Sequence, residues 1–133
     1  MPMSGNKAIL DSNVIIDFLS GNEDAVRLIS PLEQIFITAV VLGELYVGIY
    51  RIDNRAVHLK KLENFLKLCT VLDIDNNTAI RFGQIIASLY KKGKPIPTND
   101  AWIAASALQH HLPLLTNDKH FSHIEGLNLL TNY

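Results

Sequence analysis

The sequence KAILDSNVIIDFL, residues 7–19, places a short apolar strand directly before a helix. Residues 7–10 have the length and apolar character of a buried strand, and Asp11 follows them at once. Asn13 is expected to cap a helix over residues 14–19, which ends at a Ser-Gly-Asn turn. A strand joined to a helix in this way is the unit from which parallel sheets are built.

The same alternation of strands and helices continues along the rest of the chain. Apolar and β-branched runs predict strands, and longer stretches of helical periodicity lie between them. Strands are expected at residues 34–38, 70–73, 113–116 and 127–130, and helices at 23–30, 40–50, 55–68 and 77–92, with a helical turn at 119–123. Thr98 or Asn99 is expected to cap a further helix that runs to about residue 110. The fold class is therefore α/β, with a short parallel sheet of four to five strands and helices on both faces.

Composition places the chain among folded domains. Its 133 residues suit one domain, and a hydrophobic share of 48% excludes a disordered chain. A single cysteine excludes a disulfide framework and a zinc site built on thiolates, and it fits a reducing cytoplasm. The apolar runs are far shorter than the roughly 20 residues of a membrane helix, and residues 1–10 lack the pattern of a signal peptide. We therefore expect a cytoplasmic protein with no membrane segment, whose apolar share favours a buried subunit interface.

Four acidic residues stand where chemistry is expected in such a sheet. Asp11 and Asp118 follow predicted strands, and Asp100 begins a helix after a proline-rich loop. Glu44 interrupts a helix that should be buried on much of its circumference, so its carboxylate should point into a cleft. Ligand sites of open parallel sheets lie at the carboxyl ends of strands, and several buried carboxylates repel one another unless a cation neutralises them. Oxygen ligands without a cysteine or histidine set suit Mg²⁺ or Mn²⁺.

Each acid also has a structural explanation when it is taken alone. Asp100 at a helix start is a usual cap or dipole partner, and Asp11 and Asp118 could each begin a turn. Glu44 could be a paired acid of the core. The joint placement of all four at strand ends and on helices of one α/β chain favours a shared site.

Four motifs in the chain resemble the signatures of PIN-domain nucleases. They are ILDSNVIID around Asp11, TAVVLGELYVG around Glu44, NDAWIAA around Asp100 and LLTNDKHF around Asp118. Their order and spacing are similar to those of the VapC-type toxins of bacterial and archaeal toxin–antitoxin pairs, and the resemblance runs from about residue 8 to residue 130. It implies a PIN-like three-layer fold, formed by a single PIN domain over residues 1–133.

The resemblance also implies a function and a site. The chain would be a metal-dependent endoribonuclease, the toxin of such a pair, that cleaves a structured RNA such as tRNA or rRNA. The four acids would be catalytic and would hold one or two Mg²⁺ or Mn²⁺ ions. Asn13 and Thr116 would support them. The implied partners are the RNA substrate, a cognate antitoxin protein and a second copy of the chain in a homodimer.

Phosphodiester hydrolysis explains why such a site consists of carboxylates. The reaction must activate a water and stabilise charge on the phosphate and the leaving oxygen, and bound divalent cations do both. The carboxylates hold the cations, and one of them can orient or deprotonate the water. The alternative is a non-catalytic PIN-like module that binds RNA or protein, which the loss of acids would favour. All four acids are present, and this favours the enzyme.

Basic residues offer candidate contacts to RNA phosphates. The chain has 12 Lys and Arg against 13 Asp and Glu, so setting the four site acids aside leaves a basic surplus. Candidate RNA-binding residues are Arg51, Arg55, Lys91, Lys92 and Lys94. The alternative is that they belong to a solvated helix face and a helix end. Histidines 110, 111, 120 and 123 match no zinc motif and are expected on the surface, whereas Trp102 is expected in the core.

Overall fold

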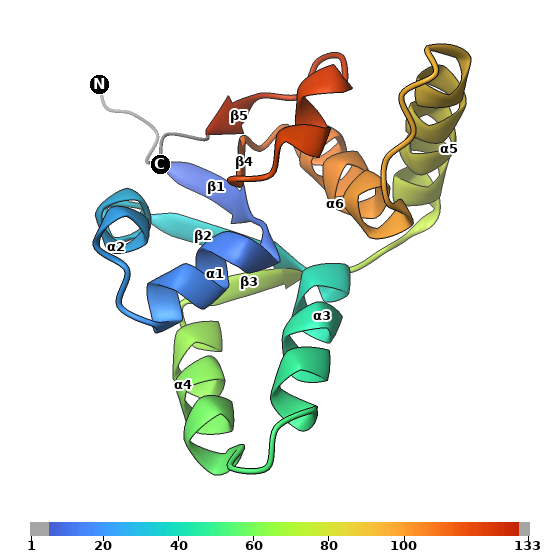
Figure 1. The fold of residues 1–133 in the computed structure, drawn as a ribbon. Helices are drawn as coiled ribbons and strands as arrows, with labels where there is room; N and C mark the ends of the chain where they lie inside the picture. Colours follow the sequence, from blue (N-terminus) through green and yellow to red (C-terminus); the bar gives the residue numbers. More distant parts are fainter. Residues whose placement is uncertain (1–5, 131–133) are drawn as a thin grey trace.

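A five-stranded parallel sheet forms the centre of the protein (Figure 1). The computed structural model describes residues 6–130, so residues 131–133 and the first five residues, on which the expectation of no signal peptide partly rests, lie outside the described part. The strands are β1 (Lys7–Leu10), β2 (Gln34–Thr38), β3 (Cys69–Leu72), β4 (Leu114–Leu115) and β5 (Leu129–Leu130). Their order in the sheet is β3-β2-β1-β4-β5, and every neighbouring pair is parallel. The predicted α/β class and parallel sheet are confirmed.

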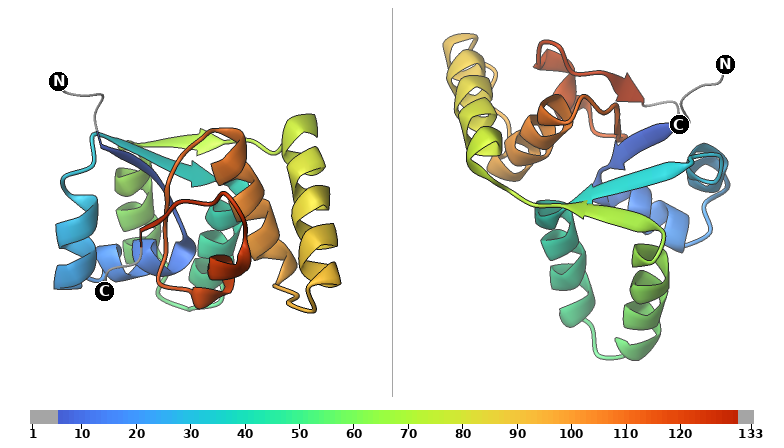
Figure 2. Two further views of the ribbon diagram at one scale, coloured as in Figure 1. Left: turned by 90° about the horizontal axis from the view of Figure 1, so that it is seen from above. Right: turned by 180° about the vertical axis from the view of Figure 1, so that it is seen from behind.

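Helices cover both faces of the sheet, as expected (Figures 1 and 2). One face carries α1 (Ser12–Leu19), α2 (Glu23–Ile29), α3 (Ala39–Tyr50) and α4 (Ala56–Leu66), and the other carries α5 (Asn76–Lys91) and α6 (Thr98–Gln109). The chain moves outward from β1 through β2 to β3 and returns to β4 on the other side of β1, so right-handed crossovers place the two sets of helices on opposite faces. A 3₁₀ turn, η1 (Lys119–His123), joins β4 to β5. Within residues 6–130, none of the helices is both long and apolar enough to cross a membrane.

Apolar burial holds the central strand between the two helical layers. Residues 8–10 of β1 are completely buried, which explains why these three consecutive positions are apolar instead of alternating. Helix α6 contributes small residues that are also completely buried, such as Ala104 and Ala105. Trp102 of α6 is partly buried, and its ring stacks on that of Phe82 in α5 with the ring centres 3.8 Å apart. This packing fixes the position of α6 relative to the sheet.

Helix α1 begins directly after β1, and its expected cap is wrong. Asp11, not Asn13, is the cap residue, because its carboxylate accepts a hydrogen bond from the backbone N–H of Ser12 at 2.8 Å. The reason is that β1 ends at Leu10 and no linker separates the strand from the helix. Asn13 lies inside the first turn, where its side-chain amide donates a hydrogen bond back to Asp11.

The expected cap of α6 is wrong as well. Pro97 occupies the cap position with a φ of −55°, and neither Thr98 nor Asn99 makes a side-chain cap hydrogen bond. Proline has its φ fixed near the helical value, so the chain enters the helix without a side-chain cap. The amide of Asn99 instead reaches toward α3, where it contacts Glu44.

Helix α3 is less buried than its sequence indicates. Its fully buried residues are Val41 and Leu45, whereas Val47 and Tyr50 are 57% and 55% exposed. The expectation that most of its circumference is buried is therefore wrong, because α3 packs against α1, α6 and β2 and leaves its remaining side open to solvent. The other side leaves an apolar surface open to a partner.

Thr38 allows a test of how the start of α3 is held. Its hydroxyl accepts the backbone N–H of Val41 at 3.0 Å, and the residue is completely buried. Thr38→Val keeps the shape but leaves this N–H without a partner, so the free energy of unfolding should fall by about 1–2 kcal/mol in urea denaturation. Thr70→Val, the same substitution at an exposed position of β3, should change it by less than about 0.5 kcal/mol. Equal losses in the two variants would contradict the role of the cap.

Candidate active site

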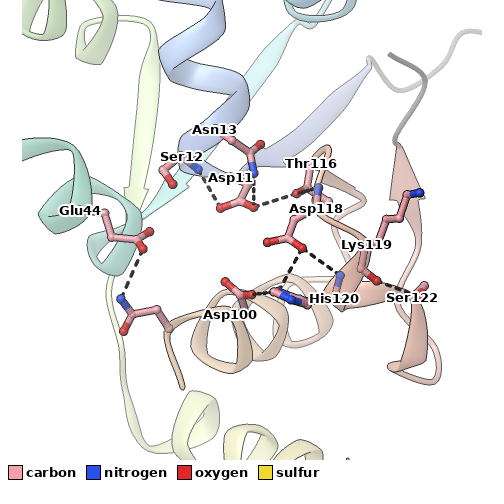
Figure 3. Close-up of polar contacts among 11 residues, drawn as sticks. Asp11, Ser12, Asn13, Glu44, Asp100, Thr116, Asp118, Lys119, His120 and Ser122 are labelled. Carbon is pink, nitrogen blue, oxygen red and sulfur yellow. Dashed lines mark hydrogen bonds and ion pairs between the residues drawn. The ribbon is translucent and has the colours of Figure 1, made fainter. Parts of the chain in front are cut away.

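The carboxyl ends of β1 and β4 form the edge at which the predicted acids gather (Figure 3). These two strands are neighbours, but their connections run to opposite faces of the sheet, and ligand sites of open α/β sheets lie at such switch points. Asp11 directly follows β1, and Asp118 lies shortly after β4. Asp100 belongs to the first turn of α6, and Glu44 faces the aspartates from α3. Four elements that are distant in sequence thus contribute one acid each.

Asp11 is fixed by three hydrogen bonds. It is only 4% exposed. Its Oδ1 accepts the backbone N–H of Ser12 at 2.8 Å, and its Oδ2 accepts the side-chain amide of Asn13 at 3.2 Å and the hydroxyl of Thr116 at 2.7 Å. Both residues predicted to support the acids therefore contact Asp11. They orient its carboxylate without neutralising its charge.

Thr116 also links the two loops that form this edge. While its hydroxyl proton is donated to Asp11, its oxygen accepts the backbone N–H of Asp118 at 3.0 Å. A second link joins the same loops, because Oδ1 of Asn13 accepts the backbone N–H of Asn117 at 3.4 Å. The positions of Asp11 and Asp118 are therefore set together.

His120 joins Asp100 to Asp118, a contact that sequence analysis missed. Its Nδ1 lies 3.2 Å from Oδ2 of Asp100 and 3.1 Å from Oδ1 of Asp118. One ligand atom from each of these three residues lies within 4.8 Å of the other two, a spacing that suits a metal ion. His120 is on the surface, as expected, but it also contacts two of the predicted site acids there. The sequence feature that could have indicated this contact is that His120 lies two residues after Asp118, within the short turn η1. Asp118 caps this turn, so the turn places the His120 side chain next to that acid.

Glu44 has a carboxylate oxygen without a partner. Its Oε2 accepts the side-chain amide of Asn99 at 3.3 Å, but its Oε1 is buried and has no hydrogen bond. A buried, unpaired carboxylate oxygen is costly, so its presence favours a ligand that the protein itself does not supply. Asn99, which sequence analysis did not assign to the site, orients Glu44 through this contact.

Burial and, to a smaller extent, repulsion between the acids raise two pKa values at this edge. Burial raises the pKa of Asp11, and the charge of Asp118 adds to the rise, against the hydrogen bonds that Asp11 accepts. Burial also raises the pKa of Asp100 to about 6, where the charges of Asp11 and Asp118 add to the effect and His120 opposes it. The edge therefore costs free energy when every carboxylate is charged, and a divalent cation bound there would offset that cost. The donor set, which is dominated by carboxylate oxygens, fits a hard divalent cation.

Comparison with known proteins agrees with this geometry. The family model of the PIN domain matches residues 8–127. The chain belongs to the PIN-domain family. The ribonuclease VapC1 of Rickettsia felis is 35% identical over 127 residues, which cover 92% of this chain and 94% of that protein. The tRNA(fMet)-specific endonuclease VapC of Shigella flexneri is 32% identical over 124 residues, which cover 91% of this chain and 94% of that protein.

Solved structures place this PIN domain among the VapC toxins. The structure of VapBC2 from Rickettsia felis, bound to a DNA fragment from its promoter, matches with a TM-score of 0.89 at 25% identity and covers 96% of this chain and 99% of that one. The DNA-bound VapBC of Salmonella typhimurium matches with a TM-score of 0.83 at 29% identity, covering 95% and 98%. The resemblance found in the four motifs is therefore confirmed. PIN-domain nucleases generally use divalent metal ions, and the acidic cluster at this edge is consistent with that use.

The basic residues predicted to contact RNA are exposed in this PIN domain. They are Arg51, Arg55, Lys91, Lys92 and Lys94. The guanidinium carbon of Arg55 lies 5.7 Å from the centre of the Tyr50 ring, and Nζ of Lys92 lies 3.8 Å from a carboxylate oxygen of Glu125. In residues 6–130, no hydrogen bond or ion pair joins these basic side chains to the four acids. Their contact with RNA stays a prediction.

Asp100→Asn tests the cost of holding a charged Asp100 at this edge of the PIN domain. The folded-state pKa of Asp100 is about 6, above that of an unfolded aspartate. The stability associated with this group is therefore present at acid pH and is lost as the pH rises from about 4 through about 6. In a chelating buffer, the variant should gain stability relative to the parent when the pH is raised from about 4 to about 7, as measured by urea denaturation. A difference between the two proteins that stays constant with pH would refute the assignment.

Proposed function

We propose that residues 1–133 form a single PIN domain that acts as a metal-dependent endoribonuclease, the toxin of a toxin–antitoxin pair. The proposed substrate is a structured RNA such as a tRNA or an rRNA, and the proposed cation is Mg²⁺ or Mn²⁺. The tRNA(fMet)-specific relative from Shigella flexneri supports this class of substrate. The observation that carries the proposal is the gathering of Asp11, Asp100 and Asp118 at one edge of the sheet, with charges that act on one another.

The proposed chemistry gives each side chain a task. A divalent cation at this edge supplies activation of a water molecule and neutralisation of charge on the phosphate. Asp11 is the fixed acid around which the site is built, because Thr116 and Asn13 restrain its carboxylate. Glu44 contributes its unpaired Oε1 from α3. These restraints preorganise the oxygen donors before RNA binds.

The proposed protein partner is a cognate antitoxin. A pocket of about 280 Å³ opens between α1, α3 and α4, and its lining is mostly apolar, with Ile16, Leu45 and Leu62 among the residues. Glu44 belongs to the same lining, so a partner in this pocket can also reach an acid of the site. An amphipathic helix that carries a cationic side chain fits both features. The VapBC complexes among the similar structures support this partner.

A homodimer is the second proposed assembly. The hydrophobic share of 48% is high for a chain of this size, and twofold dimers are the commonest soluble oligomers. Helix α5 leaves apolar side chains in solvent, including Ile80, which is 52% exposed, and Tyr90, which is 82% exposed. A dimer would align two acidic sites along one groove for a folded RNA.

Asp11→Asn tests the nuclease directly. Asparagine keeps the shape of the side chain but removes the negative charge that would hold the cation, so cleavage of purified tRNA should fall below detection with either Mg²⁺ or Mn²⁺. Denaturing gel electrophoresis measures the cleavage. Asp53→Asn, at an exposed position between α3 and α4, should cleave as the parent does. RNA that the parent protein binds but never cleaves would favour the non-catalytic module.

The salt dependence of RNA binding tests the cluster of Lys91, Lys92 and Lys94. In an Asp11→Asn background, which keeps the RNA intact, replacing all three lysines with Ala should flatten the slope of log affinity against log salt by roughly one unit for each lost phosphate contact. Filter binding at several salt concentrations measures the slope. The matched control replaces three other exposed lysines, Lys7, Lys60 and Lys67. A slope equal to that of the parent would show that the cluster is only the solvated end of α5.

A further inference from the structure

His120 lies against two of the proposed site acids on their solvent side. Its Nδ1 is 3.2 Å from Oδ2 of Asp100 and 3.1 Å from Oδ1 of Asp118, while 54% of its side chain remains exposed. Figure 3 shows the ring beside these two acids, at the end of the cluster that is farther from Glu44. The imidazole therefore borders the carboxylates and is also open to water.

The fold determines this position of His120. The backbone N–H of His120 donates a hydrogen bond to Oδ1 of Asp118 at 2.9 Å, so the acid caps the turn that carries the histidine. The next residue, Phe121, is completely buried and anchors η1 to the core. Because the backbone is held on both sides of the ring, the contact with the acids is built into the turn.

A single hydrogen bond does not account for both contacts. A neutral imidazole has one N–H, and its Nδ1 can direct a proton well toward one oxygen only. Two ligands at neighbouring corners of an octahedral cation, each about 2.1–2.2 Å from the ion, lie about 3 Å apart. The separations of 3.1 and 3.2 Å match this spacing between His120 and each of the two acids. One ligand atom from each of the three residues also lies within 4.8 Å of the other two, close enough for all three to reach one cation.

We propose that His120 is a nitrogen ligand, through Nδ1, of a divalent cation that Asp100 and Asp118 also bind, and that this nitrogen favours Mn²⁺ over Mg²⁺. The inference rests on the proposed function for the acids as cation ligands and adds a residue to them. Mg²⁺ strongly prefers oxygen ligands, whereas first-row transition metals accept imidazole. A nitrogen at this corner therefore raises the affinity for Mn²⁺ more than that for Mg²⁺.

Pulsed electron paramagnetic resonance on the Mn²⁺-loaded protein tests this directly. The parent protein should show the modulation of a ligating imidazole nitrogen, and His120→Gln should lose it while keeping the backbone contact to Asp118. His123→Gln, in the same turn, is the matched control and should keep the modulation. A parent protein that binds Mn²⁺ without nitrogen modulation would overturn the proposal.

Cation affinity provides the second measurement. His120→Gln should weaken Mn²⁺ binding by about tenfold or more and Mg²⁺ binding much less, so the ratio of the two dissociation constants should move toward one. Equal losses for the two cations would overturn the proposal, because the histidine would then only hold the acids in place. Neither measurement uses RNA. The cleavage assay on purified tRNA is separate from both measurements. If the parent protein shows the nitrogen signal but cleaves no RNA, the proposed nuclease fails and this inference stands. If the parent protein cleaves RNA but shows no nitrogen signal, only this inference fails.

Discussion

The cost of holding charged carboxylates buried and close together at the ends of β1 and β4 is the constraint to which the rest of the structure responds. The buried residues 8–10 of the central strand, the small residues of α6 and the hydroxyl of Thr116 keep Asp11 close to Asp100 and Asp118, although charge alone would separate them. Apolar burial supplies the free energy that offsets this cost. The acids are thus held in place before any cation binds. A bound cation would offset the free-energy cost of keeping these buried carboxylates close together.

The sequence predicts the sheet and the four acids for the same physical reason. A strand covered on both faces is apolar at consecutive buried positions, so residues 8–10 of β1 and 35–37 of β2 stand out from the polar residues around them. The carboxyl ends of parallel strands lie at one edge of a sheet, which allows acids far apart in the chain to be assigned to one place. The helix caps are harder, because moving the start of α1 by two residues decides whether Asp11 or Asn13 is the cap.

Contacts between distant elements could not be predicted from the sequence. Asn99 and Glu44 are 55 positions apart, and His120 and Asp100 are 20 apart, so no local pattern connects them. Each contact depends on how α6 packs against its neighbours in three dimensions. The exposed side of α3 was missed for a similar reason, since an apolar helix looks alike whether its second face meets the core or a partner.

The hydrogen bond from Thr116 to Asp11 spans 105 positions of the chain. During synthesis Asp11 and Glu44 leave the ribosome well before β4, which Thr116 and Asp118 directly follow. Until β4 pairs with β1, the acids are scattered along an unfinished chain and no assembled site exists. A nascent chain that still lacks β4 therefore carries Asp11 and Glu44 without Thr116 and Asp118.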